Sequence, residues 1–221
     1  MSTQPLLELE NLSTHYVSAQ GTRVVRAVDE VSLRINAGET LGIVGESGAG
    51  KSTLALTILR LLPPAARIAG GKLLFEGEDL LQKSEVEMRR VRGKRIAMIL
   101  QDPMASLNPL FTIGDQVAEP IRVHEGAGRA AAWSRACELL KAVRIPSPQT
   151  RLRQHPHEMS GGMRQRIVGA ISDRTHIGAF RHILQNHSIF PFKDTIDCEL
   201  AVVLERRVNL REGRHARILV F

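Results

Sequence analysis

Residues 45–53 read Gly-Glu-Ser-Gly-Ala-Gly-Lys-Ser-Thr and match the phosphate-loop pattern GxxxxGK[ST] at every defined position. An apolar run at residues 41–44 precedes this stretch, and a second apolar run at residues 54–56 follows it. This order is typical of a strand, a loop and a helix, which is the context that the pattern requires. Glycines let several backbone N–H groups point at one anion, and the dipole of the following helix adds positive charge. The stretch therefore predicts a cradle for phosphate groups.

Two side chains of this stretch have predicted roles. We expect Lys51 to reach the outer phosphates of a bound triphosphate and the Ser52 hydroxyl to bind Mg²⁺. The alternative is a glycine-rich turn before a helix, with no ligand. The candidate nucleotide-binding residues of the stretch are Gly45, Ser47, Gly48, Gly50, Lys51, Ser52 and Thr53.

The composition is ordinary for a soluble globular chain. Its 221 residues suffice for one sizeable domain or a domain with an appendage, and 43% are apolar and 24% charged. No window is apolar for long enough to cross a bilayer, and residues 1–5 lack the layout of a signal peptide. Cys137 and Cys198 have no metal-binding or redox spacing, which favours a reducing cytosol.

The net charge of +7 is compatible with an anionic partner. The basic residues are scattered along the chain, however, and aromatic residues make up only 4% of it. A nucleic-acid surface usually combines clustered basic residues with aromatic residues that stack on bases. We therefore expect a solvated basic surface and no nucleic-acid partner.

The hydrophobic pattern predicts strands around the phosphate loop and helices further along. Short, largely alternating spacing of apolar residues makes residues 6–35 rich in strand. Ser84 and Glu87 form a capping-box pair that opens a helix reaching about Arg92. Further strands are expected at residues 40–44, 72–75 and 96–100, and helices at 51–62, 112–143 and from about 160. In the long helical segment one apolar stripe is interpreted as core packing: Trp133, Ala136, Leu140 and Val143.

A second motif, residues 159–166, reads Met-Ser-Gly-Gly-Met-Arg-Gln-Arg. A serine and two glycines at the start of a helix form another helix N-terminus that suits an anion. One chain does not need two such sites for one triphosphate, whereas two chains arranged head to tail do. Alone, Ser160 could be an ordinary helix N-cap, but it follows Gly50 of the phosphate loop by 110 residues. This combination favours a shared two-chain site to which Ser160, Gly161 and Gly162 contribute.

With these two motifs the chain resembles the ATP-binding subunits of ABC transporters. The second motif is similar to the family's Leu-Ser-Gly-Gly signature, with Met159 in place of leucine. Gln101 ends a predicted strand, as the family's Q-loop glutamine does, which implies contact with Mg²⁺ or the attacking water. Tyr16 lies where the family places an aromatic residue that stacks on adenine, and a surface aromatic on a strand is the alternative. The resemblance implies ATP and Mg²⁺ as ligands, with Ser52 and Gln101 at the metal.

The resemblance is closest to the importers of oligopeptides, dipeptides and nickel. Residues 101–109 are similar to the extended Q-loop of this group, and residues 45–48 and 61–64 match it as well. The resemblance implies that two ATPase subunits, identical or paralogous, close over two ATP·Mg²⁺ and drive a pair of integral-membrane permease subunits. Residues 160–162 would contact the γ-phosphate held by the partner. Such a subunit is cytoplasmic and peripheral on the inner face of the cell membrane.

The expected fold is an α/β P-loop NTPase domain of the ABC type. It has a mixed sheet core, an N-terminal antiparallel β region and a helical subdomain near residues 105–160. We assign residues 1–173 to this domain, which is incomplete at its C-terminal end. Residues 174–221 are an unassigned tail of different composition, with four of the eight His but only two of the 18 Gly. A truncated or frame-shifted copy is favoured over a divergent tail.

The tail lacks the groups that the family uses for hydrolysis. Where the family has four apolar residues followed by Asp-Glu, residues 181–186 contain no carboxylate. Residues 200–205, Leu-Ala-Val-Val-Leu-Glu, come later and lack the Asp, so they are interpreted as an ordinary strand or helix. The family's switch histidine is not identifiable, because four histidines match it only by residue type: His176, His182, His187 and His215.

The expected activity is reduced accordingly. A general base alone contributes about 10²–10⁴ to a rate, so hydrolysis should fall by several orders of magnitude. The sequence predicts a subunit resembling those that power import of peptides or nickel, binding nucleotide weakly and hydrolysing it poorly or not at all. In one alternative Glu205 is a substitute carboxylate in an active ATPase. A non-transport ABC ATPase and a non-catalytic truncated remnant are the others.

Overall fold

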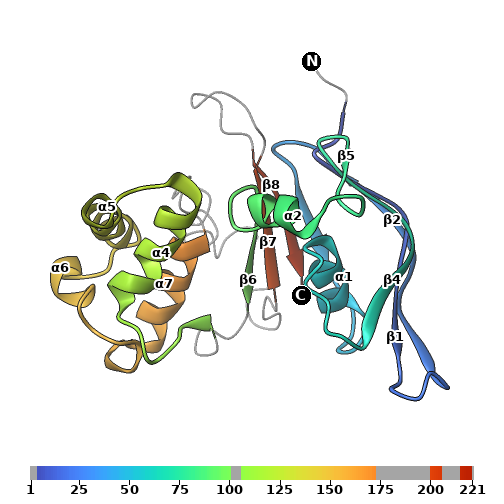
Figure 1. The fold of residues 1–221 in the computed structure, drawn as a ribbon, viewed down its shortest axis with the longest axis horizontal. Coiled ribbons are helices and arrows are strands. Elements are labelled where there is room, and N and C mark those ends of the chain that lie inside the picture. The colour runs from blue at the N-terminus through green and yellow to red at the C-terminus, as the bar shows by residue number, and fades with distance from the viewer. Residues whose placement is uncertain (1–3, 101–105, 173–199, 206–214, 221) are drawn as a thin grey trace. The chain divides into compact units, whose positions relative to one another are not determined.

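The computed structural model describes residues 4–100, 106–172, 200–205 and 215–220 (Figure 1). The chain divides into two compact units, which we call the sheet unit (residues 1–98 and 197–221) and the helical unit (residues 99–196).

An antiparallel sheet forms the N-terminal part of the sheet unit. Its strand order is β2-β1-β4-β5, with β1 at Leu7–Val17, β2 at Val24–Ile35, β4 at Ala66–Phe75 and β5 at Glu78–Asp79. Strand β1 is flanked on both sides, since Leu7 pairs with Ile35 of β2 and with Phe75 of β4. The expected N-terminal antiparallel region is therefore confirmed, and β4 begins earlier than the predicted strand at 72–75 because β1 pairs with it along its whole length.

A second sheet contains the strand that leads into residues 45–53. Its order is β3-β8-β7-β6, with β3 at Thr40–Ile43, β6 at Ile96–Leu100, β7 at Leu200–Glu205 and β8 at His215–Val220. Strand β8 runs parallel to β3, whereas β7 runs antiparallel to β8. The sheet is mixed, as expected, and the tail supplies its strands β7 and β8.

Helices α1 (Lys51–Ile58) and α2 (Glu85–Val91) complete the described part of the sheet unit. Leu54, Ile58 and Met88 are buried in one core with the apolar side chains of the antiparallel sheet. The predicted capping box of α2 is present. Helix α1 ends earlier than the predicted helix at 51–62, because the N–H of Arg60 donates to Thr57 and Arg60 takes a left-handed φ of +52°.

The helical unit contains five described helical segments around its own core. They are α4 at Ile113–Glu125, α5 at Arg129–Ala142, α6 at Pro148–Arg151, the 3-10 helix η1 at Pro156–Glu158 and α7 at Gly161–Ser172. The segment predicted to be helical at 112–143 contains two helices, because Gly126 with a φ of +68° ends α4 and Gly128 precedes α5. Ala136, Leu140 and Val143 of the predicted stripe are buried, whereas Trp133 is only partly buried.

Candidate nucleotide-binding site

The phosphate loop lies between β3 and α1, as the sequence predicts. Gly48 and Gly50 both have a φ of +85°, a conformation that residues with a side chain rarely adopt. Gly50 also has no room for a side chain, because a Cβ there would lie 1.9 Å from the carbonyl oxygen of Ala27. Gly48 and Gly50 are therefore required by backbone shape, and Gly50 also by the close approach of Ala27 in β2.

Lys51 is folded over this loop. The residue is only 7% exposed, and its Nζ donates hydrogen bonds to the carbonyl oxygens of Gly45 (2.7 Å) and Glu46 (2.8 Å). The ammonium group thus holds the loop closed around itself. Ser52, the next residue, is exposed on the first turn of α1. A cation and a hydroxyl therefore lie side by side in sequence at the helix N-terminus, where negative charge is stabilised.

Tyr16 is placed beside the phosphate loop. It lies on β1, half-buried, and its Oη is 3.5 Å from Oγ1 of Thr53, the last residue of the loop pattern. Two of the predicted nucleotide-binding residues, Tyr16 and Thr53, are therefore neighbours in the structure. That proximity is consistent with one ligand contacting both.

The second motif lies at the start of α7 in the helical unit. Met159 is buried in the core of that unit, whereas Ser160, Gly161 and Gly162 are all exposed. The hydroxyl of Ser160 accepts a long hydrogen bond from the N–H of Met163 (3.4 Å), so it also caps the helix. A Cβ at either glycine would meet no atom within 4 Å. Among the described residues nothing packs against either glycine position, which leaves this surface open to a ligand there.

Hydrogen bonds from the side chain of Arg166 to backbone carbonyl oxygens hold the first turn of α7 in place. Arg166 donates from Nε to Gly162 (3.1 Å) and from Nη1 to Arg144 (2.7 Å). Sequence reasoning missed this role, although the arginine belongs to the quoted motif. The exposed Ser-Gly-Gly segment is therefore presented by a fixed helix end, with a buried Met159 on one side and Arg166 on the other.

Of the two predicted Mg²⁺ ligands, Ser52 and Gln101, only Ser52 lies in the described residues. Ser52 offers a hydroxyl oxygen, which suits this hard cation, and Gln101 lies outside the described residues. Within the described ranges no group of three His, Cys, Asp or Glu residues could hold a metal ion. Mg²⁺ commonly takes most of its ligands from phosphate and water, so the Ser52 hydroxyl fits a metal brought in with a nucleotide.

The register of the tail strands decides what Glu205 can do. Val220 of β8 pairs with Ile43, at the end of β3 that leads into the phosphate loop. Glu205 of β7 pairs with His215, at the opposite end of β8. Five residues separate His215 from Val220, which is about 17 Å along a strand at ~3.3 Å per residue. The backbone of Glu205 therefore lies far from the phosphate loop, and the alternative in which Glu205 replaces the missing carboxylate is wrong.

The same register bears on the histidine candidates. His215 begins β8 at the end remote from the loop, so it does not take the position of a switch residue either. His176, His182 and His187 lie outside the described residues.

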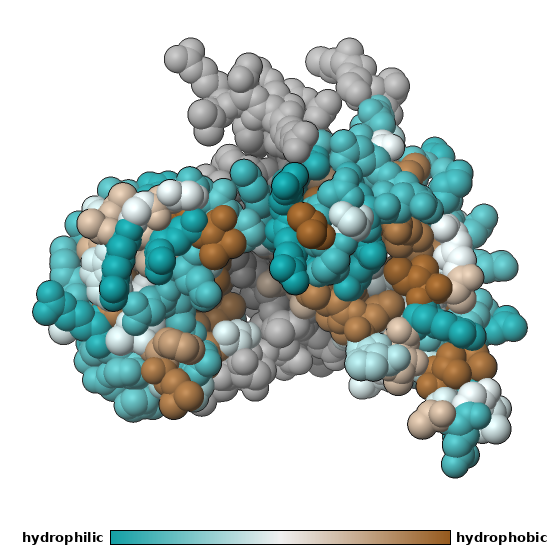
Figure 2. All heavy atoms as spheres, in the orientation of Figure 1, coloured by the Kyte–Doolittle hydropathy of each residue, from teal (hydrophilic) through white to brown (hydrophobic). Residues whose placement is uncertain are grey.

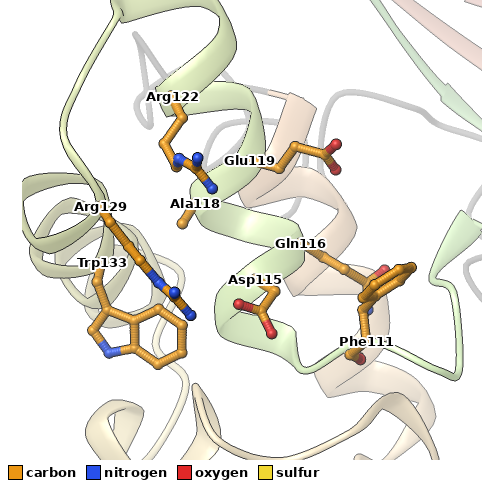
Figure 3. Close-up of a pocket in the computed structure, with 8 residues that line it drawn as sticks. All are labelled: Phe111, Asp115, Gln116, Ala118, Glu119, Arg122, Arg129 and Trp133. Atoms are coloured by element: carbon orange, nitrogen blue, oxygen red, sulfur yellow. The ribbon is translucent and has the colours of Figure 1, made fainter.

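The helical unit also has a surface pocket that the sequence did not predict. Its volume is about 390 Å³, and it lies between α4 and α5 (Figure 3). Asp115, Ala118 and Arg122 come from α4, and Arg129 and Trp133 from α5. Trp133 was interpreted as a core residue, whereas the structure places it half-buried at this pocket. The sequence signal that could have indicated the pocket is the set of charged residues at i, i+4 and i+7 along α4.

The segment next to this pocket exposes large apolar side chains. Leu110 is 81% exposed, Phe111 55% and Val123 69%, and Phe111 lines the pocket itself. In the space-filling view, apolar side chains lie at the surface among hydrophilic ones (Figure 2). Leu110 and Phe111 are adjacent in the chain, and exposed apolar groups that gather in one patch commonly mark a protein contact.

A strand, a glycine-rich loop carrying a lysine, and a helix on a mixed sheet define the class of P-loop nucleotide-binding domains. Residues 28–172 match the family described as ABC transporter, and this chain belongs to that family. The matched range includes both the phosphate loop and the Ser-Gly-Gly motif. It ends before the tail.

Relatives and solved structures agree with this assignment. The chain is 51% identical over 168 residues to a probable peptide ABC transporter ATP-binding protein, y4tR, of Sinorhizobium fredii, covering 76% of this chain and 50% of that protein. It is 48% identical to the oligopeptide transport ATP-binding protein OppD of Bacillus subtilis, covering 76% of this chain and 46% of OppD. A dimeric bacterial ABC transporter cassette, MJ0796, is similar in structure (TM-score 0.63, 26% identity, 75% of this chain and 68% of that one).

The sequence matches cover most of this chain but a smaller share of each relative. The chain spans about half the length of the curated relatives it matches. None of the helices in the described ranges is both long and apolar enough to span a membrane.

Proposed function

We propose that this chain is the ATP-binding subunit of an ABC-type importer of peptides, with impaired hydrolysis of its own bound nucleotide. The observation that carries the proposal is the family match over residues 28–172, since it joins the phosphate loop and the Ser-Gly-Gly motif in one chain. The peptide-transport names of its relatives support the substrate class, for which nickel is the alternative.

The proposed work of the loop is to bind and neutralise phosphate. Lys51 exchanges its hydrogen bonds to Gly45 and Glu46 for the outer phosphates, while backbone N–H groups of the loop contact the inner ones. The Ser52 hydroxyl and the Gln101 side chain hold Mg²⁺, which supplies positive charge for the phosphates when bound. Tyr16 stacks on adenine. Phosphoryl transfer depends mainly on such positioning and charge neutralisation.

The register of the strands beside β3 supports the proposal of impaired hydrolysis. The two strands next to β3 and β6 in this sheet come from the tail, and the carboxylate-bearing end of β7 points away from the loop. The one carboxylate residue in the described part of β7 and β8, Glu205, therefore lies at the strand end remote from the loop. The loss of a general base costs about 10²–10⁴ in rate.

The proposed partners are a second ABC ATPase subunit and integral-membrane permease subunits. Residues 160–162 serve the nucleotide bound by the second ATPase, which fits their exposure and the open space that the described residues leave at Gly161 and Gly162. The surface formed by Leu110, Phe111 and the pocket of α4 and α5 binds the permease. Through this contact the chain is held on the cytoplasmic face of the membrane, and it binds no nucleic acid.

Calorimetry and phosphate release test the nucleotide part of the proposal. Wild-type chain should bind Mg²⁺·ATP, and Lys51→Ala should weaken that binding at least about tenfold, because a charge-assisted contact to phosphate is lost. Phosphate release should not exceed the Lys51→Ala background. Turnover that depends on Lys51 would contradict the impaired hydrolysis, and absence of ATP binding would contradict the whole proposal.

A thermal melt separates the proposal from a misfolded remnant. We expect one cooperative transition whose midpoint rises with Mg²⁺·ATP, since a ligand that binds only the folded state stabilises it. No cooperative transition at all would support the remnant instead.

Affinity capture from detergent-solubilised membranes of the source cell tests the permease contact. Phe111→Asp should abolish recovery of multi-spanning permease subunits identified by mass spectrometry. Val86→Asp is the matched control, since Val86 is similarly exposed (61%) but lies on α2 of the sheet unit. Failure to recover a permease with wild-type chain would favour a non-transport ABC ATPase.

A further inference from the structure

Four hydroxyl-bearing residues join strand β1 to helix α1 inside the sheet unit. Thr14 and Tyr16 are two residues apart on β1, so both face the same side of the strand. Thr53 and Thr57 are four residues apart on α1, so both lie on one face of the helix. Thr14 Oγ1 is 2.9 Å from Thr57 Oγ1, and Tyr16 Oη is 3.5 Å from Thr53 Oγ1. We call these four residues the hydroxyl ladder.

The inner rung of the ladder is buried, and its hydrogen bonds have one direction. Thr14 and Thr57 are both 0% exposed. Thr57 Oγ1 donates its only proton to the carbonyl oxygen of Thr53 at 2.7 Å. Thr14 must therefore be the donor to Thr57. A continuous chain of hydrogen bonds runs from β1 to the backbone of Thr53, and such buried chains strengthen one another.

This chain of hydrogen bonds ends on the phosphate loop. Thr53 is the last residue of the loop pattern and directly follows Ser52. Helix α1 cannot rotate about its axis relative to β1 without leaving the buried Thr14 hydroxyl unpaired, which is unfavourable. The outer rung connects the same turn to the ring of Tyr16. The ladder thus determines both the rotation of α1 about its axis, relative to β1, and the position of Tyr16.

We propose that the hydroxyl ladder holds the Tyr16 ring and the phosphate loop as one preorganised unit for a ligand that contacts both, a nucleoside triphosphate. The inference rests on the proposed function, in which Tyr16 stacks on the base and residues 45–53 bind the phosphates. A ligand that bridges two groups already fixed in place avoids the cost of ordering them on binding. Thr14 and Thr57 are then positioning residues, since neither touches the ligand.

The ratio of two affinities tests this inference. Thr14→Val/Thr57→Val removes both inner hydroxyls at nearly constant shape and leaves no buried side-chain hydroxyl unpaired, so the fold should be retained. Calorimetry on the full chain compares ATP with tripolyphosphate, which reaches the loop but has no base for Tyr16. We expect the ATP affinity to fall about fivefold or more, and the tripolyphosphate affinity to change less than about twofold. Equal losses for both ligands, or no loss, would overturn the inference.

Two further variants separate positioning from stability. Thr57→Ser, made alone in the wild-type chain, keeps the hydroxyl and should therefore keep the wild-type preference for ATP over tripolyphosphate. Ser13→Ala is the matched control, because Ser13 is the buried neighbour of Thr14 and accepts the N–H of Glu30 at 2.9 Å outside the ladder. It should lower the melting temperature and leave the affinity ratio unchanged.

A third variant covers the case in which the double variant does not fold. Tyr16→Phe removes only the outer rung and keeps the ring, and it should lower the ATP affinity about twofold without affecting tripolyphosphate. Wild-type chain that binds neither ligand would refute the proposed function itself. Wild-type preference for ATP that persists in both the double variant and Tyr16→Phe would refute the ladder alone.

Discussion

Gly50 carries two separate demands at the end of the phosphate loop. Its φ of +85° is costly for any residue with a Cβ, and the carbonyl oxygen of Ala27 occupies the place where that Cβ would lie. The first demand concerns backbone conformation alone, whereas the second concerns contact with another segment. The cost of the left-handed φ and the cost of the Ala27 contact can be separated by comparing a substitution at Gly50 with one at a glycine that has only the left-handed φ.

Gly50→Ala should disrupt the phosphate loop. We expect a loss of unfolding free energy of at least about 2 kcal/mol, because the clash is with backbone and the strain adds to it, together with loss of ATP binding. Gly38→Ala is the control, since Gly38 has a similar φ of +87° but no atom within 4 Å of a Cβ, and should cost about 1–2 kcal/mol. Urea denaturation measures both, and equal losses would show that the Ala27 contact does not matter.

Glu158 introduces a pH dependence just before the Ser-Gly-Gly segment. The N–H of His155 donates to its Oε2 at 2.7 Å, and this bond lowers the pKa of the Glu158 carboxyl below its ordinary value of 4.5, helped by the side chain of Gln154. A lowered folded-state pKa means that the carboxylate contributes stability fully above pH 4.5. That contribution is lost as the pH falls through the lowered folded-state value.

Glu158→Gln should therefore remove part of the acid sensitivity. Wild-type chain should be more stable than the variant near pH 6, and the difference in melting temperature should shrink as the pH falls to about 3. Calorimetric scans across that range provide the measurement. Glu125→Gln is a control, since Glu125 is an exposed glutamate of α4. A wild-type–variant difference that grows on acidification would contradict the assignment.

At the scale of elements, helix α4 is held by a glycine. A Cβ at Gly114 would lie 2.3 Å from the Trp133 ring and 2.7 Å from the carbonyl oxygen of Leu152, to which the Gly114 N–H donates at 2.7 Å. The N-terminus of α4 therefore approaches both α5 and the segment after α6 more closely than any other residue would permit.

Gly114→Ala should separate these elements. We expect a loss of about 1–3 kcal/mol in unfolding free energy, which is the usual cost of inserting a methyl group into a filled space, and a change in Trp133 fluorescence, since Trp133 is the one tryptophan of the sequence. Gly128→Ala, at a position with open space and an ordinary φ, should change neither. Unchanged fluorescence in Gly114→Ala would argue against the close contact.

Sequence patterns predicted the elements that depend on neighbours in the chain. The capping box of Ser84 and Glu87, the phosphate-loop conformation and the start of α7 are all local, and all three are present. The segment at 112–143 was predicted to be helical, but the break inside it was not located. Gly126 marks that break, since it takes a left-handed φ after α4.

Features that depend on distant partners could not be read from the sequence. Residues 200–205 suit a strand or a helix equally, and only pairing with β8 decides between them. The direction of β7, which places Glu205 away from the loop, has no local signal at all. The hydrogen bonds of Lys51 to Gly45 and Glu46 likewise depend on how the loop closes on itself.

At the scale of the whole molecule, the tail completes the sheet that carries the phosphate loop. Strand β8 has neighbours on both sides, β3 and β7, so its backbone N–H groups are used in two ladders. The described part of the tail is therefore part of the fold, although it lies outside the range that matches the family.

Ile218→Pro should test how much the sheet unit depends on this strand. Proline removes an N–H from a strand paired on both sides, and we expect a loss of about 3 kcal/mol or more in unfolding free energy with weaker ATP binding. His215→Pro is the control, since proline is tolerated at the first residue of a strand. Denaturation profiles of the two variants that coincide would show that β8 does not support the phosphate-loop strand.

The pairing of Thr40 with Arg217 has a consequence for the order in which the molecule is made. These two residues lie 177 positions apart, so the strand before the phosphate loop leaves the ribosome long before its neighbour exists. At about 5–20 residues per second, that interval is roughly 10–35 s. During it β3 lacks β8, the one strand it pairs with in the described sheet, and its unpaired edges are sites for wrong pairing with other chains. The antiparallel sheet of β1, β2 and β4 draws on residues 7–75 only, so it can form first and shield the apolar side of α1 while the second sheet waits for its last strand.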